Sequence, residues 1–198
     1  GYVEYGATSG WRWACEEAGL DYEVRTIPFD GRETNHLERQ PFGQVPFLND
    51  GGLKIFESGA GLLHLARKSE ALMPRDPAGE AQTLEWTIAA LNSIEMVSVP
   101  WWFLKICGDP DNQLTGWLRQ RLDGVERVLS EREWLAGGRF TIADLLMADV
   151  LRVREVRAFG ERPASEAYVA RITERPAFRK AQADQIRQFE AADAARAG

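Results

Sequence analysis

Two parts of this 198-residue sequence follow different hydrophobic periods, and the change falls at residues 71–79. Before this segment, alternating apolar and polar stretches are interleaved with short stretches of helical period. After it, apolar residues recur at the three- and four-residue spacing of amphipathic helices. The segment itself contains two prolines and a glycine, which interrupt both patterns. We therefore expect an α/β domain at 1–70, a linker at 71–79 and an all-α helical domain at 80–198.

The first part has the signals of a small α/β unit. The expected elements are a strand at 2–5, a helix from about 11 to 18, a strand at 22–27, a hairpin at 45–56 and a helix from 58 to about 68. Gly19 stands where a helix C-cap belongs, and the hairpin turn at 49–52 consists of residues that tolerate positive φ. Ser58 is expected to cap the following helix through its side chain.

The second part is expected to be helical throughout. The expected helices span 80–103, 113–130, 141–153, 165–173 and 176 to about 189. Pro100 lacks an amide hydrogen and should bend or break the first of them. Thr141 and Asp144 have the spacing of a capping box, so Asp144 is interpreted as a folding element. Residues 190–198 have no apolar face and are expected to fray.

Composition excludes several classes of protein. The hydrophobic content of 44% and the nine Phe and seven Trp are typical of a globular chain, and no apolar run approaches the length of a membrane span. The net charge of −6 gives no general attraction to nucleic acid or anionic lipid. Cys15 and Cys107 form no C-x-x-C motif, and the two His have no metal-binding spacing, so no metal is expected. We interpret both cysteines as buried thiols in a reducing cytoplasm.

Two short motifs in the first part could together bind a ligand. A cis peptide bond between Val45 and Pro46 would turn the Val45 backbone toward a ligand, whereas a trans proline would simply begin an edge strand. Glu57 and Ser58 lie where a strand passes into a helix, and the N-terminus of a helix attracts anions. Ser58 could either cap that helix or bind a carboxylate.

Three stretches together resemble the soluble glutathione transferase family, in the right order and at the right spacing. They are Pro41-Phe42-Gly43-Gln44-Val45-Pro46-Phe47-Leu48, Phe56-Glu57-Ser58-Gly59-Ala60-Gly61-Leu62-Leu63 and Arg139-Phe140-Thr141-Ile142-Ala143-Asp144-Leu145. The similarity to bacterial-type members extends through residues 12–20. The resemblance implies a thioredoxin-like N-terminal domain followed by the helical domain, with a cis bond at Pro46.

The resemblance also implies an activity and a binding site. Members of the family transfer the thiolate of glutathione to a small hydrophobic electrophile. Their glutathione site corresponds here to Gln44, Val45, Pro46, Glu57 and Ser58, with glutathione as the co-substrate. Alternatives on the same fold are a glutathione-dependent isomerase, dehalogenase or peroxidase, or a non-catalytic assembly module.

The residue that activates the thiol is expected between the first strand and the first helix, where family members carry a Tyr, Ser or Cys. An ungapped alignment with serine-type members places Gly6 at the serine position, so this sequence departs from the pattern. Ser9 and Thr8 are the nearest hydroxyls to the helix start, and Ser9 could equally be a helix cap. Tyr5 or Tyr2 could also serve. Cys15 lies well inside the helix, which argues against a cysteine mechanism.

The remaining implications concern the second substrate and the assembly. Trp101 and Trp102 follow Pro100 and could line a pocket for apolar electrophiles, whereas Trp86 and Trp117 are interpreted as core. Arg32 is a weaker candidate for binding the glycine carboxylate of glutathione. A homodimer in the cytoplasm, with no nucleic-acid or membrane partner, is expected.

Overall fold

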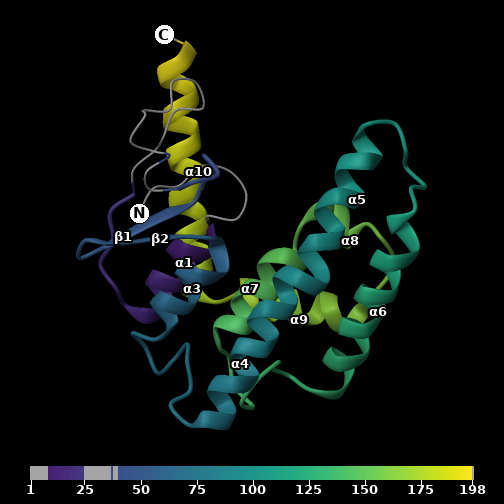
Figure 1. The fold of residues 1–198 in the computed structure, drawn as a ribbon, viewed down its shortest axis with the longest axis horizontal. Coiled ribbons are helices and arrows are strands. Elements are labelled where there is room, and N and C mark those ends of the chain that lie inside the picture. The colour runs from purple at the N-terminus through teal and green to yellow at the C-terminus, as the bar shows by residue number, and fades with distance from the viewer. Residues whose placement is uncertain (1–8, 25–36, 38–39, 198) are drawn as a thin grey trace. The chain divides into compact units, whose positions relative to one another are not determined.

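The computed structural model describes residues 9–24, 37 and 40–197, without the side chains of residues 9 and 195–197. Contacts divide the chain into two compact units (Figure 1). The first unit, Gly1–Ser69 with Glu174–Gly198, contains α1 (Ser9–Ala18), β1 (Phe47–Asp50), β2 (Leu53–Phe56), α3 (Ser58–Ala66) and α10 (Pro176–Ala197). The second unit, Glu70–Thr173, contains α4 (Pro77–Ala89), the π-helix η1 (Ala90–Glu95), α5 (Met96–Ile106), α6 (Leu114–Glu131), α7 (Ile142–Leu151), α8 (Arg154–Arg157) and α9 (Pro163–Thr173).

The C-terminal helix packs with the first unit, which differs from the grouping expected at 80–198. In Figure 1, α10 runs beside α1. The ring of Phe178 on α10 meets the fully buried Trp13 edge-on, with centroids 4.8 Å apart. Arg175 donates from Nε to the Glu17 carboxylate at 2.6 Å. Helix α10 also continues to Ala197, beyond the helix end expected at about residue 189.

The hairpin forms as expected, with a small shift in its limits. Phe47 pairs with Phe56 and Asp50 with Leu53, so the strands begin two residues after Val45 and the loop is Gly51-Gly52. Both glycines have positive φ, 58° and 92°, which a hairpin of two loop residues requires. The strand expected at 2–5 lies outside the described residues. Residues 22–24 of the strand expected at 22–27 carry no regular structure.

Helix α7 is the buried centre of the second unit, and all ten of its residues are buried. The predicted capping box at its start is confirmed. The fully buried Asp144 carboxylate accepts hydrogen bonds from the Thr141 amide at 2.8 Å, the Leu135 amide at 2.9 Å and the Tyr168 hydroxyl at 2.9 Å. Burial raises the pKa of Asp144, and these hydrogen bonds act in the opposite direction. Asp144 therefore joins three segments of the unit.

The long helix expected at 80–103 runs instead from Pro77 to Ile106 in three segments. Its irregularity is the π-helix at Ala90–Glu95, and Pro100 lies inside the regular helix α5. The expected break at Pro100 is therefore wrong. A π-helical turn, like a proline, redirects a helix by changing its hydrogen-bond ladder. No helix in the described part of the chain is both long and apolar enough to cross a membrane.

Burial corrects three further expectations. Trp117 is 39% exposed and lies under the Arg121 guanidinium, so it is not core. Trp86 is half-buried, with the Arg132 guanidinium 5.2 Å from its ring centroid. Cys107 is exposed, whereas Cys15 is buried.

The segment expected to be a linker belongs to the core of the second unit. Leu72 and Met73 are buried, and the Leu72 carbonyl accepts the Ile142 amide at 2.9 Å. Asp76 then caps α4 by accepting the Gly79 amide at 2.7 Å. Its prolines and glycine thus shape a packed turn rather than a free connection.

Candidate functional site

The turn that leads into β1 is organised by a buried glutamine. The Gln40 side-chain oxygen accepts the amides of Phe42 at 2.7 Å and Gln44 at 3.2 Å. The Val45–Pro46 peptide bond that follows is cis, as the sequence predicts. Because the strand ladder begins only at Phe47, the Val45 backbone lies outside it. Gln44 is exposed, Val45 is half-buried and Pro46 is buried.

The start of α3 is a helix N-terminus without a side-chain cap. Glu57 precedes the helix with φ 69° and ψ 127°, and its side chain forms no capping hydrogen bond. Ser58 is the first helical residue, so its expected role as the N-cap is wrong. The Glu57 carbonyl accepts the amide of Gly61 at 3.1 Å. The amides of the first helical residues before Gly61 have no acceptor within a helix and form, with the helix dipole, a site for an anion.

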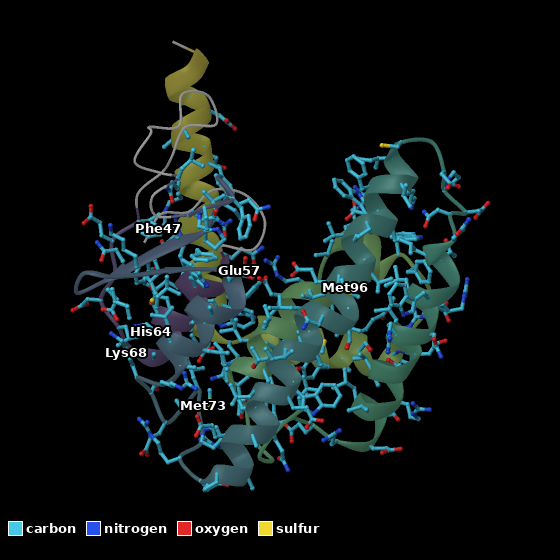
Figure 2. The ribbon with its side chains drawn as sticks, viewed as in Figure 1. Phe47, Glu57, His64, Lys68, Met73 and Met96 are labelled. Atoms are coloured by element: carbon cyan, nitrogen blue, oxygen red, sulfur yellow. The ribbon has the colours of Figure 1, made fainter. Side chains whose placement is uncertain are left out.

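The hairpin brings these two segments to the same end of the first unit. Phe47 pairs directly with Phe56, so Pro46 and Glu57 flank one end of the hairpin. Figure 2 labels Phe47 and Glu57. The sequence separates these residues by a turn and two strands, and the antiparallel register brings them together. The structure therefore gathers the five residues predicted to bind glutathione, Gln44, Val45, Pro46, Glu57 and Ser58.

A tryptophan fixes the start of α1 beside the start of α3. The Trp11 indole donates to the Ser58 carbonyl at 2.8 Å. A Cβ on Gly61 would lie 2.3 Å from the Trp11 ring, so only glycine allows this approach. The roles of Trp11, Gly61 and Gln40 were not predicted from the sequence. The glycine spacing of 59–61 in an otherwise apolar helix was the available signal for a close approach.

The candidates for thiol activation fall mostly outside the described residues. Ser9 is the first residue of α1, but its side chain, Thr8, Tyr5, Tyr2 and Gly6 are not described. Arg32 also lies outside the described residues. Their roles stay predictions.

Cys15 is unsuited to act as a nucleophile. It is buried in α1, and burial raises its pKa to about 11, so the thiol is neutral near pH 7. This agrees with the prediction against a cysteine mechanism.

His64 joins the hairpin to α3. Its Nε2 lies 2.6 Å from the Asp50 carboxylate, which also contacts Lys68 (Figure 2). Hydrogen bonds from His64 and Lys68 lower the pKa of Asp50. This cluster lies at the turn end of the hairpin, opposite Pro46, and is structural.

The two tryptophans predicted to line the second-substrate pocket differ in burial. Trp101 is 4% exposed, donates to the Thr115 hydroxyl at 3.1 Å and packs edge-on against Phe159. Trp102 is 40% exposed. The exposed apolar residues of α5 form a larger set than the sequence analysis identified: Met96, Val99, Trp102, Phe103, Leu104 and Ile106.

Comparisons with known proteins agree with this geometry. The family pattern described as glutathione S-transferase, N-terminal domain, matches residues 3–67, and the one described as glutathione S-transferase, C-terminal domain, matches residues 111–176. Glutathione S-transferase 1 of Zea mays is 34% identical over 165 residues, which are 71% of this chain and 75% of the relative. Glutathione S-transferase F7 of Arabidopsis thaliana is 30% identical over 187 residues, 84% of this chain and 90% of the relative.

A solved structure of a glutathione S-transferase has a similar fold. The crystal structure of maize glutathione S-transferase I in complex with an atrazine glutathione conjugate superposes with a TM-score of 0.77 and 28% identity. The superposition covers 92% of this chain and 95% of the maize chain.

Proposed function

This chain belongs to the glutathione S-transferase family and is a glutathione S-transferase, and from that premise we propose that Gln44, Val45, Pro46, Glu57 and Ser58 bind glutathione. One observation carries the proposal: the hairpin register sets the cis-proline turn beside the uncapped start of α3. Glutathione is a peptide with a free carboxylate at its γ-glutamyl end, so it matches an exposed peptide edge next to an anion site.

Each residue has a distinct role in this proposal. The Val45 backbone, which lies outside the ladder, pairs with the cysteinyl unit of glutathione like an added strand. The first amides of α3 and the Ser58 hydroxyl bind the γ-glutamyl carboxylate. The Glu57 carboxylate lies near the ammonium group, and the exposed Gln44 contributes at the edge of the turn.

The thiol of glutathione must lose its proton to react. We place the sulfur near the N-terminus of α1, where the Ser9 hydroxyl donates a hydrogen bond to it, with Thr8 as the alternative. The sulfhydryl proton passes to solvent and its bonding pair stays on sulfur. The thiolate then attacks an electrophilic carbon, and the leaving group departs with the pair of the broken bond. The positive end of the α1 dipole favours the charged sulfur.

A small hydrophobic electrophile is the proposed second substrate. Its support is the exposed apolar surface of α5 that includes Trp102. Trp101 holds that helix in place through its contacts with Thr115 and Phe159. The maize structure named above contains a glutathione conjugate of atrazine.

We also propose that the protein forms a homodimer and is located in the cytoplasm. Phe42 is 66% exposed at the turn before β1, and Leu53 is exposed at the start of β2, which suits burial against a second copy. Cys15 and Cys107 are both free thiols, as is usual in a reducing compartment.

Changing Ser58 to Ala tests the glutathione site. It removes a hydroxyl that donates to a charged group, so the affinity for glutathione should fall by about 1–3 kcal/mol in isothermal titration calorimetry. Fold stability should change little, because Ser58 is only partly buried and is not the N-cap residue of α3.

The matched control is Ser130→Ala, an exposed serine of α6 in the second unit, which should bind glutathione like the unmodified protein. Absence of glutathione binding by the unmodified protein would reject the proposed site. Equal affinity of the Ser58 and Ser130 variants would reject the role of Ser58.

A further inference from the structure

A tryptophan on α1 makes a hydrogen bond to the helix end that the proposed function assigns to the γ-glutamyl carboxylate. Trp11 is 3% exposed, and its indole Nε1 donates to the Ser58 carbonyl at 2.8 Å. Ser58 is the first residue of α3, so this carbonyl lies in the turn whose amides are proposed to bind the carboxylate. The contact therefore links α1 directly to the proposed ligand site.

The Ser58 carbonyl does not depend on the indole for a partner. The carbonyl of the first residue of an α-helix accepts the amide four residues further on, and a carbonyl oxygen has two lone pairs. The indole is thus a second donor to an oxygen that the helix already uses. A phenylalanine at position 11 would fill similar space and would leave no buried donor to satisfy, so the fold alone does not require the indole N–H.

The carbonyl of Ser58 and the amide of Gly59 belong to one peptide unit. This unit is planar, so a hydrogen bond that holds its oxygen also holds the direction of its N–H. The Gly59 amide precedes Gly61, whose amide is bonded to the Glu57 carbonyl, and has no acceptor within the helix. Donation to the oxygen polarises the unit, because hydrogen bonds in a chain strengthen one another by about 10–30%. Gly59 is buried, where this polarisation is stronger than in water.

Gly61 allows the indole to reach the carbonyl. A Cβ at this position would lie 2.3 Å from Cζ2 of Trp11 and 2.9 Å from Nε1, the donating atom. Any larger residue would therefore push the indole away from Ser58. Glycine is a poor helix former compared with alanine, so its presence inside α3 favours the indole contact at the expense of the helix.

We propose that Trp11 is a positioning residue for glutathione, whose indole orients and polarises the Ser58–Gly59 peptide unit so that it donates more strongly to the γ-glutamyl carboxylate. The inference rests on the proposed function, because it requires that carboxylate at the start of α3. Trp11 acts through this peptide unit and not on the reacting sulfur. Loss of the indole N–H should therefore raise the KM for glutathione and leave kcat at saturating glutathione unchanged.

Two substitutions at position 11 remove the N–H. Trp11→Phe keeps an aromatic ring, and Trp11→benzothienylalanine also keeps the shape of tryptophan. Both should weaken glutathione binding about two- to tenfold in isothermal titration calorimetry, as expected when a hydrogen bond to a charged group is weakened but not lost. The KM for glutathione should rise by a similar factor, measured with one reactive aryl halide as the second substrate.

A second ligand separates this role from a structural one. The peptide γ-aminobutyryl-cysteinyl-glycine is glutathione without the carboxylate of its γ-glutamyl unit. Its kcat/KM, which can be determined without saturation, should be lower than that of glutathione in the unmodified protein and should not fall further in Trp11→Phe. A tryptophan that only supports the fold would lower kcat/KM for both ligands by the same factor.

The same helix offers a matched control. Trp13 is also buried in α1, and its indole donates to the Glu17 carboxylate at 3.0 Å instead of to α3. Trp13→Phe should lower the melting temperature without changing the glutathione affinity of the folded protein. Gly61→Ala should weaken glutathione binding like Trp11→Phe, and the double variant should bind little more weakly than either single variant, because both changes remove one contact.

The outcomes separate this inference from the proposed function. If the unmodified protein binds glutathione and both variants of Trp11 bind it equally well, the role of Trp11 is overturned and the glutathione site stands. An equal loss of kcat/KM for the two ligands would assign Trp11 to the fold and would also overturn it. Absence of glutathione binding in the unmodified protein would overturn this inference together with the proposed function.

Discussion

Three helices of the second unit differ from α3 of the first unit in how their N-termini are capped. In the second unit, carboxylates occupy the N-termini of three helices: Asp76 at α4, Asp144 at α7 and Glu126 at α9. In the first unit, α3 begins without a side-chain cap. An anionic side chain at a helix N-terminus stabilises the helix. Where no anionic side chain occupies the N-terminus of a helix, the first amides of that helix are available to a ligand.

Two buried arginines also differ. Arg162 in the second unit donates to Asp123 at 2.8 Å. In the first unit, Arg12 has no such partner among the described residues. Arg162 is thus paired with a carboxylate, although its Nε has no partner among the described residues, whereas Arg12 has neither its Nε nor its Nη2 paired there. A helix N-terminus or a charged side chain that has no partner within the fold is therefore a candidate place for a ligand to bind.

Removing the Asp144 carboxylate should have the largest effect. Asp144→Ala leaves the amides of Leu135 and Thr141 and the Tyr168 hydroxyl buried without an acceptor. The free energy of unfolding should fall by about 3–5 kcal/mol, measured by denaturant unfolding. Asp111→Ala, at an exposed aspartate, is the control. A loss below about 1 kcal/mol would mean that the second unit does not depend on its internal caps.

Glu126→Gln should have a smaller, pH-dependent effect. Burial acts to raise the pKa of Glu126, but hydrogen bonds from Ser165 and the Ala164 amide, with the Arg162 charge, lower it overall. The variant loses the charge at the start of α9, which should reduce the free energy of unfolding by about 1–2 kcal/mol near pH 7.

A lowered pKa in the folded state means that the ionised carboxylate stabilises the fold above its ordinary pKa, about 4.3. The difference between Glu126→Gln and the unmodified protein should therefore shrink as the pH falls below that value. Glu131→Gln, at the exposed C-terminal end of α6, the helix that also carries Glu126, should show no such trend. A difference that is constant with pH would show that the Glu126 charge contributes nothing.

Local signals made much of the fold predictable. The capping box at Thr141 and the hairpin around Gly51 and Gly52 depend on neighbouring residues, and both are confirmed. The cis bond at Pro46 was expected from the family resemblance. The packing of α10 against α1 was not predictable, because the contact of Trp13 with Phe178 joins residues from opposite ends of the chain.

The candidate glutathione site was also predictable only in part. Its motifs were visible in the sequence, but the supports that position them were not. The Trp11 indole donates to the carbonyl of Ser58, a residue far away in the sequence. No sequence motif around Gln40 indicates that its side chain accepts a backbone amide of the turn. The burial of Arg12 Nε and Nη2 without a partner among the described residues was not predictable, because it depends on how α1 packs against distant segments.

The smallest expected effect concerns Glu57, whose φ of 69° and ψ of 127° place a residue with a Cβ in a conformation that favours glycine. Glu57→Gly and Glu57→Ala both remove the carboxylate proposed to lie near the glutathione ammonium. Only the glycine variant also removes the backbone strain. Because glycine loses more conformational entropy on folding, its net advantage over alanine should be modest, about 0.5–1 kcal/mol in the free energy of unfolding.

Both Glu57 variants should bind glutathione more weakly than the unmodified protein, as measured by isothermal titration calorimetry. If Glu57→Gly is no more stable than Glu57→Ala, the strain assigned to this position is absent. If the glycine variant is more stable yet binds as tightly as the unmodified protein, the strain has no connection with the ligand. Higher stability with weaker binding would extend the contrast to the backbone: at Glu57, as at the uncapped start of α3, the first unit would hold an arrangement that bound glutathione, rather than the fold, makes favourable.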